Sequence, residues 1–198
     1  MRLPLVERKR LQARERVVRA AEELFAERGF DAVSVADIAD RAEVGRTTFF
    51  RHFGDKQEVV FARQHELVAT IASAHEQSAA SVPSGPAEAI AQLRDVVLAL
   101  CAQVTKDPDS YTRHYAFIAQ NAELRARDAV KMQDLANLLS RILTRRGADE
   151  RTALFASQVA LACYQIAKAR RGNEPRSLVA ETREAFQEVL ALGSHHGD

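Results

Sequence analysis

The sequence contains few cysteines, the residues whose disulfides stabilise small or secreted proteins. Its 198 residues include two cysteines, Cys101 and Cys163, which are too few for a disulfide framework and lie in no metal-ligand spacing. No window long enough to span a membrane as a helix is free of charge. The first residues, MRLPLVERKRLQARERVV, carry charges where a signal peptide needs an apolar stretch. We therefore expect a cytoplasmic protein with reduced, buried thiols.

The motifs of common enzyme classes are also absent from the sequence. It has no phosphate-binding glycine loop, no HExxH zinc motif, no repeated ExxH pair and no GxSxG nucleophile elbow. The adjacent His195 and His196 lack further ligands for a metal. We therefore expect no cofactor and no metal, and a helical-bundle enzyme remains only as an alternative to a binding protein.

Apolar and helix-forming residues are abundant. Hydrophobic residues make up 46% and charged residues 28% of the chain, a mixture typical of globular proteins with a real core. Ala, Leu, Glu, Arg and Gln dominate, and β-branched residues never alternate cleanly with polar ones. The sequence therefore predicts an all-α fold.

Glycines, prolines and capping residues divide the chain into helices and two domains. The predicted helices cover residues 10–28, 35–42, 46–53, 56–80, 86–105, 108–120, 122–146, 150–171 and 176–192. We assign residues 1–55 to an N-terminal three-helix domain. Residues 56–198 form a larger helical body.

Two short helices with a three-residue turn lie at the centre of the N-terminal domain. Ser34 is the expected N-cap of the first helix, while Ile38 and Phe49 are among the apolar residues that would lock the two helices together. This arrangement predicts a helix-turn-helix, whose second helix enters the major groove of DNA. The alternative is a surface helical hairpin with solvated charges.

The exposed face of the second short helix carries groups suited to binding double-stranded DNA. Arginine can bond guanine in a bidentate manner, and threonine can bond a base or a phosphate. The polar residues on this face are Arg46, Thr47, Thr48, Arg51 and His52. Ser34 and Lys56, each at a helix N-terminus, are placed to bind phosphates.

Positive charge gathers at the N-terminus of a chain whose net charge is only +1. Acidic residues there are Glu7 and Glu15, against the basic residues Arg2, Arg8, Lys9, Arg10, Arg14, Arg16 and Arg19. Such an arm either contacts a polyanion or forms a solvated, frayed terminus.

One stretch of the chain resembles a known family. Residues 21–60 read AAEELFAERGFDAVSVADIADRAEVGRTTFFRHFGDKQEVV. This stretch, above all its runs LFAERGFDAVSVADIADRAEV and TTFFRHFGDK, resembles the N-terminal domain of the tetracycline-repressor (TetR) family of bacterial regulators. The remainder is similar only in being helical and of suitable length.

The resemblance implies a homodimer that binds a palindromic operator and releases it when a small-molecule effector enters the body. It also implies that Phe50 faces DNA. Activation instead of repression stays open, as does a dimeric regulator without small-molecule control.

Two positions depart from the family's pattern. Glu43 stands in the turn where the family often has glycine; if its φ is positive, glutamate costs about 1 kcal/mol relative to glycine. Phe50 stands where the family usually has a tyrosine whose hydroxyl reaches a phosphate. Phe50 can therefore supply only packing and sugar contacts.

Polar groups on apolar helical faces are the candidate effector contacts. Tyr111, His114, Tyr115 and Ile118 share one face of a predicted helix. A ligand site is mostly apolar with a few convergent polar groups, so we expect a largely apolar or aromatic effector. The remaining candidates are Phe61, His65 and Tyr164. Each of these residues could instead be an ordinary buried group with its own partner.

The last two predicted helices are candidates for the dimer interface. Residues 153–167, ALFASQVALACYQIA, are apolar around most of the helix circumference and need cover on several sides. Two such helices from each subunit could form a two-fold symmetric four-helix interface, or they could close the monomer's own core. The candidate interface residues are Phe155, Val159, Val179, Phe186, Val189 and Leu190.

Overall fold

The computed structural model describes residues 4–76, 81–170 and 174–194. Within these ranges the chain forms helices and turns and no strand, which confirms the all-α prediction. Arg2, His195 and His196 lie outside the described residues. No helix in the described ranges is long and apolar enough to cross a membrane.

The chain divides into two compact units between His65 and Glu66, whereas the sequence placed the boundary between residues 55 and 56. The N-terminal unit comprises residues 1–65 and the body residues 66–198, and each is described by itself. The later boundary arises because residues 56–60 pack against the first helix.

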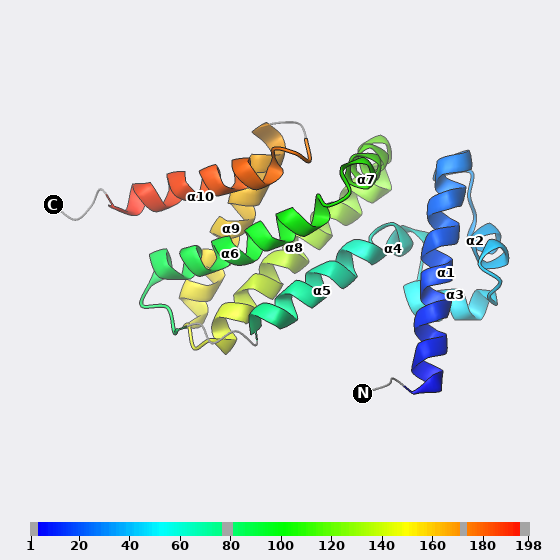
Figure 1. The fold of residues 1–198 in the computed structure, drawn as a ribbon, viewed down its shortest axis with the longest axis horizontal. Coiled ribbons are helices and arrows are strands. Elements are labelled where there is room, and N and C mark those ends of the chain that lie inside the picture. The colour runs from blue at the N-terminus through cyan, green and yellow to red at the C-terminus, as the bar shows by residue number, and fades with distance from the viewer. Residues whose placement is uncertain (1–3, 77–80, 171–173, 195–198) are drawn as a thin grey trace. The chain divides into compact units, whose positions relative to one another are not determined.

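The N-terminal unit is built around one long helix (Figure 1). Its helices are α1 (Leu5–Arg28), α2 (Val35–Arg41), α3 (Arg46–Phe53), α4 (Lys56–Val60) and the first residues of α5 (Ala62–Glu76). Helix α1 buries Val17, Ala21 and Leu24 and packs against α2, α3 and α4. It begins before the predicted residue 10, so the described part of the basic arm is helical and not frayed.

The predicted long helix after Asp55 is in fact two helices, α4 and α5, separated at Phe61. The amide of Phe61 donates to the carbonyl of Glu58, which tightens the chain into a three-residue turn. The Phe61 side chain is completely buried. Burial of this ring therefore accompanies the break, which the helical pattern of the sequence did not reveal.

The described residues of the body form five further helices near their predicted positions. They are α6 (Pro86–Val104), α7 (Pro108–Gln120), α8 (Ala122–Arg145), α9 (Glu150–Arg170) and α10 (Leu178–Ser194). Capping residues set several of the boundaries. The carboxylate of Asp107 accepts from the amide of Ser110, and the side chain of Asn121 caps α8.

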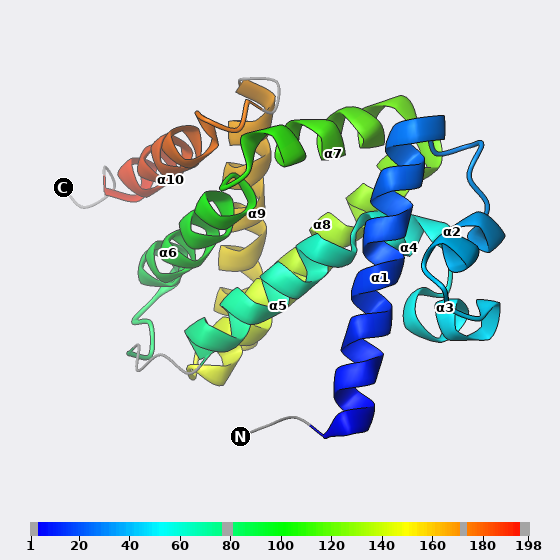
Figure 2. The same cartoon turned by 45° about the vertical axis from the view of Figure 1, so that its right-hand side comes forward.

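Helix α9 is the centre of the body and packs against α6, α8 and α10 (Figure 1 and Figure 2). Its inner face is made of small residues, including Ala153, Ala156 and Ala160, which are completely buried. Small side chains allow neighbouring helices to approach closely. Phe186 of α10 contributes a large, fully buried ring to the same core.

Candidate functional site

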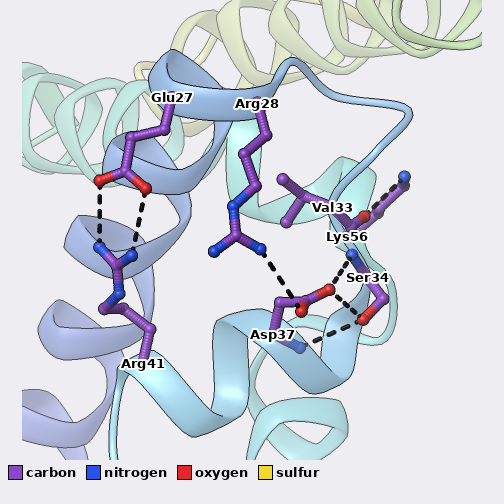
Figure 3. A network of polar contacts seen from close by, with 7 residues as sticks. All are labelled: Glu27, Arg28, Val33, Ser34, Asp37, Arg41 and Lys56. Carbon is purple, nitrogen blue, oxygen red and sulfur yellow. Dashed lines mark hydrogen bonds and ion pairs between the residues drawn. The ribbon is translucent and has the colours of Figure 1, made fainter.

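Helices α2 and α3 form the predicted helix-turn-helix, and the chemistry of each helix end fixes its shape. Ser34 is the N-cap of α2: its hydroxyl accepts from the amide of Asp37, and its own amide donates to the Asp37 carboxylate at 2.8 Å (Figure 3). This reciprocal pair is a capping box. The hydrogen bonds from Ser34 lower the pKa of Asp37.

The turn between α2 and α3 is a Schellman motif with an unusual residue. The amide of Val44 donates to the carbonyl of Ala39 at 3.0 Å, and the amide of Glu43 donates to the carbonyl of Asp40 at 3.1 Å. The motif needs a left-handed residue, most often glycine, and here that residue is Glu43 with a φ of 53°. The condition under which Glu43 is less favourable than glycine, a positive φ, is therefore met.

Fully buried apolar side chains, Ile38 of α2 and Phe49 of α3, lie in the core of the motif. The opposite side of α3 is polar and open to solvent, because Arg46, Thr47 and Arg51 are exposed and Thr48 is half-buried. Side chains available for hydrogen bonding therefore line one side of a short helix.

Phe50 adds an apolar element to the exposed side of α3. Phe50 is 47% exposed, and its ring packs edge-on against that of Phe49 with the ring centroids 5.6 Å apart. Single exposed apolar side chains are common on protein surfaces, so this ring alone does not identify a contact surface.

His52 lies in a cationic environment formed by two helices. Burial lowers its pKa, and the charges of Arg10, Arg51 and Arg14 lower it further. The guanidinium of Arg14 stacks over the ring of Phe53, 5.1 Å from its centroid. The helical N-terminal arm therefore adds positive charge beside the C-terminal end of α3.

Lys56 braces the loop between α1 and α2. Its ammonium donates to the carbonyls of Phe30 at 2.9 Å and Val33 at 3.0 Å, and it lies 4.1 Å from the centroid of the Phe30 ring. Figure 3 shows Lys56 beside the cap of α2. Two of its three donors are thus engaged within the protein.

Ion pairs join the C-terminal half of α1 to α2. Arg41 donates to both carboxylate oxygens of Glu27 at 3.3 and 3.1 Å, and Arg28 lies 3.7 Å from Asp37 (Figure 3). The hydrogen bond from Arg41 lowers the pKa of Glu27. Because these groups are exposed, we expect them to set the orientation of α2 more than its stability.

The effector candidates fall into two separate units. Phe61 is buried in the N-terminal unit, where His65 lies 4.0 Å from the carboxylate of Glu58. The others lie in the body: Tyr111, Tyr115 and Ile118 of α7 and Tyr164 of α9 are buried, and His114 is half-buried.

Tyrosine and histidine rings of the body pack against one another. The Tyr111 and Tyr115 rings are 4.6 Å apart, and His114 meets Tyr115 edge-on at 5.1 Å. The hydroxyls of Tyr115 and Tyr164 share a hydrogen bond of 3.2 Å. Burial, followed by the charge of Lys168, lowers the pKa of His114 to about 4, so its imidazole is neutral near pH 7.

Lys168 and Asp128 complete this cluster, and sequence reasoning missed both. The Lys168 ammonium lies 4.1 Å from the centroid of the Tyr115 ring and 3.9 Å from an Asp128 oxygen. Lys168 follows Tyr164 by one helical turn, a spacing that could have linked the two residues. Asp128 had no such signal, because it stands in a highly charged part of α8.

The predicted interface residues differ in their exposure. Phe155 of α9 is 53% exposed, whereas Phe186 of α10 is completely buried within the chain's own core. The residues with intermediate exposure are Val159, Val179, Val189 and Leu190. Leu154 and Ile166 of α9 are exposed as well, although the sequence did not single them out.

Comparison with known proteins matches the N-terminal unit to one family. Residues 17–62 match the family described as "Bacterial regulatory proteins, tetR family". The chain is 44% identical over 55 residues to the HTH-type transcriptional regulator TcmR of Streptomyces glaucescens, an alignment covering 28% of this chain and 24% of TcmR. The chain thus aligns with about a quarter of the length of that relative.

Two longer matches extend into the body. The chain is 27% identical over 157 residues to the HTH-type transcriptional regulator HbdR of Aromatoleum sp. (strain CIB), covering 78% of this chain and 66% of HbdR. The solved structure of FadR from Thermus thermophilus, a repressor in complex with lauroyl-CoA, superposes with a TM-score of 0.59 at 22% identity. That match covers 89% of this chain and 93% of FadR.

Proposed function

Because the chain belongs to the TetR family of helix-turn-helix regulators, we propose that it is a transcriptional repressor that binds a palindromic operator as a homodimer. The observation that carries this proposal is the polar, exposed side of α3, fixed on a buried apolar core by the capping box and the turn. Because bacterial chromosomal DNA lies in the cytoplasm, we propose that the protein acts there.

The contacts with DNA divide into base readers and phosphate contacts. We assign base reading to Arg46, Thr47 and Thr48 at the N-terminal end of α3, which enters the major groove first in this motif. Phosphate and sugar contacts fall to Ser34, Phe50, Arg51, His52 and Lys56. Lys56 has one donor left for a phosphate beyond its two carbonyl bonds.

The exposed side of α9 supports dimerisation. Leu154, Phe155 and Ile166 are exposed large apolar residues on one helix, and burying them against a second copy removes apolar area from water. Val159 and, on α10, Val189 and Leu190 extend this proposed interface. Val179 belongs to the same proposed interface, while Phe186 supports it from within the core.

The body is the proposed effector domain. FadR, whose fold is similar, was solved with a small molecule, lauroyl-CoA, and the buried cluster around Tyr111 and Tyr115 supplies polar groups in an apolar setting. The effector weakens DNA binding only if it binds the DNA-competent conformation less well than another one. By linkage, DNA must weaken effector binding by the same factor.

DNA binding is tested with the full chain and a duplex selected from a random library. If a dimer neutralises about six to ten phosphates, its affinity should fall about 10³- to 10⁵-fold between about 50 and 200 mM salt. Arg46→Ala should cost about 1–3 kcal/mol and relax the preference at one base pair per half-site. Tight binding with a flat salt response, or selection of no common sequence, would contradict the proposal.

A further inference from the structure

The cluster in the body has polar atoms whose hydrogen-bonding capacity the protein does not use. The hydroxyl of Tyr111 and one carboxylate oxygen of Asp128 are buried and have no hydrogen-bond partner among the described residues. The other oxygen of Asp128 lies 3.9 Å from the Lys168 ammonium, beyond hydrogen-bond distance. Buried polar atoms are nearly always paired, so these atoms indicate a missing partner.

The unpaired atoms belong to one environment. Tyr111 packs against Tyr115, and the Lys168 ammonium lies over that same ring. Burial raises the pKa of Tyr111, and the nearby Asp128 carboxylate contributes to the rise. Tyr111 and Asp128 are therefore linked through Tyr115 and Lys168 in one buried cluster.

The charges of the cluster cancel. Lys168 and Asp128 carry opposite charges and are both largely buried, while the low pKa of His114 leaves its ring neutral. The Asp128 carboxylate would repel an anionic ligand, and the Lys168 ammonium would repel a cationic one. Either ion would also lose its hydration on burial, so the cluster disfavours charged ligands.

We infer that this cluster binds the hydroxyl group of a neutral aromatic ligand, of the phenol class. A hydroxyl both donates and accepts hydrogen bonds, so it can donate to the unpaired Asp128 oxygen and accept from Tyr111. The ligand's ring packs against the tyrosine rings, which favour offset or edge-on aromatic neighbours. This inference rests on the proposed function, because it identifies the ligand class of the effector domain.

The first test compares four probes of similar size by calorimetry on the full chain at neutral pH. They are para-ethylphenol, para-ethylanisole, para-ethylbenzoate and para-ethylbenzylamine. We expect para-ethylphenol to bind about tenfold more tightly than each of the others. Equal binding of the anisole, tighter binding of either ion, or binding of no probe would overturn the inference.

The second test uses a matched pair of variants. Tyr111→Phe removes a hydroxyl without a partner among the described residues, so it should raise the Tm of the ligand-free protein by about 2–4 °C. It should also weaken the binding of para-ethylphenol about tenfold. Ser157→Ala removes a buried hydroxyl outside the cluster, one that donates to the carbonyl of Leu154. It should not raise the Tm and should leave the affinity for para-ethylphenol unchanged.

If Tyr111→Phe left the affinity for para-ethylphenol unchanged, the Tyr111 hydroxyl would be bonded to a buried water and not to the ligand. The inference would then be wrong. DNA binding is measured separately, with the selected duplex. If para-ethylphenol binds as expected and DNA affinity stays constant, the ligand class stands and effector control fails. If another compound releases DNA while no phenol binds, effector control stands and the ligand class fails.

Discussion

The N-terminal unit and the body use their polar side chains differently. Around the helix-turn-helix, the exposed Ser34 and Arg41 and the half-buried Lys56 bond to carboxylates or carbonyls of neighbouring segments. In the body, Tyr111 and Asp128 each hold a buried atom without a hydrogen-bond partner among the described residues, whereas the N-terminal unit holds one such atom, on His52. The first unit therefore presents a surface arranged by its own hydrogen bonds, and the body gathers unused bonding capacity in one cluster, where we infer a ligand.

The largest effect is expected in the core of the body. Phe186→Asp removes a fully buried ring and buries a carboxylate, so it should cost at least about 4 kcal/mol of unfolding free energy. Phe155→Asp changes an exposed residue of α9 and should leave the subunit folded but monomeric. Thermal unfolding and sedimentation measure the two outcomes.

A Phe155→Asp protein that remains a stable dimer would place the interface elsewhere. A Phe186→Asp protein that unfolds like the wild type would show that the body does not depend on the α9–α10 core.

Protonation of His114 should make the protein less stable in acid. Its pKa is about 4 in the folded protein and about 6.5 in an unfolded chain. The unfolded state therefore binds an extra proton between these values, so stability should fall by about 2–3 kcal/mol as the pH drops from about 6.5 to 4. The free energy of unfolding, measured with urea at several pH values in this range, should depend less on pH in His114→Gln than in the wild type. An unchanged pH dependence would exclude His114 as the source.

Removing the brace in the N-terminal unit should have an intermediate effect. Lys56→Ala leaves the carbonyls of Phe30 and Val33 without their donor, which should cost about 1–3 kcal/mol of stability. DNA affinity should fall equally for all sequences, unlike in Arg46→Ala. A Lys56→Ala variant with normal stability and altered base preference would reverse our assignment of the two residues.

The smallest effect is expected in the turn. Glu43→Gly relieves a positive φ and should stabilise the protein by about 1 kcal/mol, whereas Glu43→Ala keeps the strain. Glu43 also lies 3.8 Å from Arg16, but this exposed pair contributes little. Equal Tm values for the glycine and alanine variants would show that backbone strain is not the cause.

The N-terminal unit could be predicted in detail because its signals are local. The cap at Ser34, the stop at Gly54 and the left-handed Glu43 all depend on residues within a few positions along the chain. The break at Phe61 accompanies the burial of its ring, and the pairing of Asp128 with Lys168 joins segments distant in sequence. A helical pattern predicts which face is apolar, but not which charge on another helix will meet it.

The inner and outer faces of helix α9 differ in how they tolerate substitution. Replacing an inner alanine such as Ala156 by a larger residue overpacks the core, while replacing Phe155 on the outer face costs the subunit's own fold little. In the dimer that we propose, the outer positions of α9 can therefore diverge after gene duplication until two paralogues no longer pair, while the fold of each subunit stays intact.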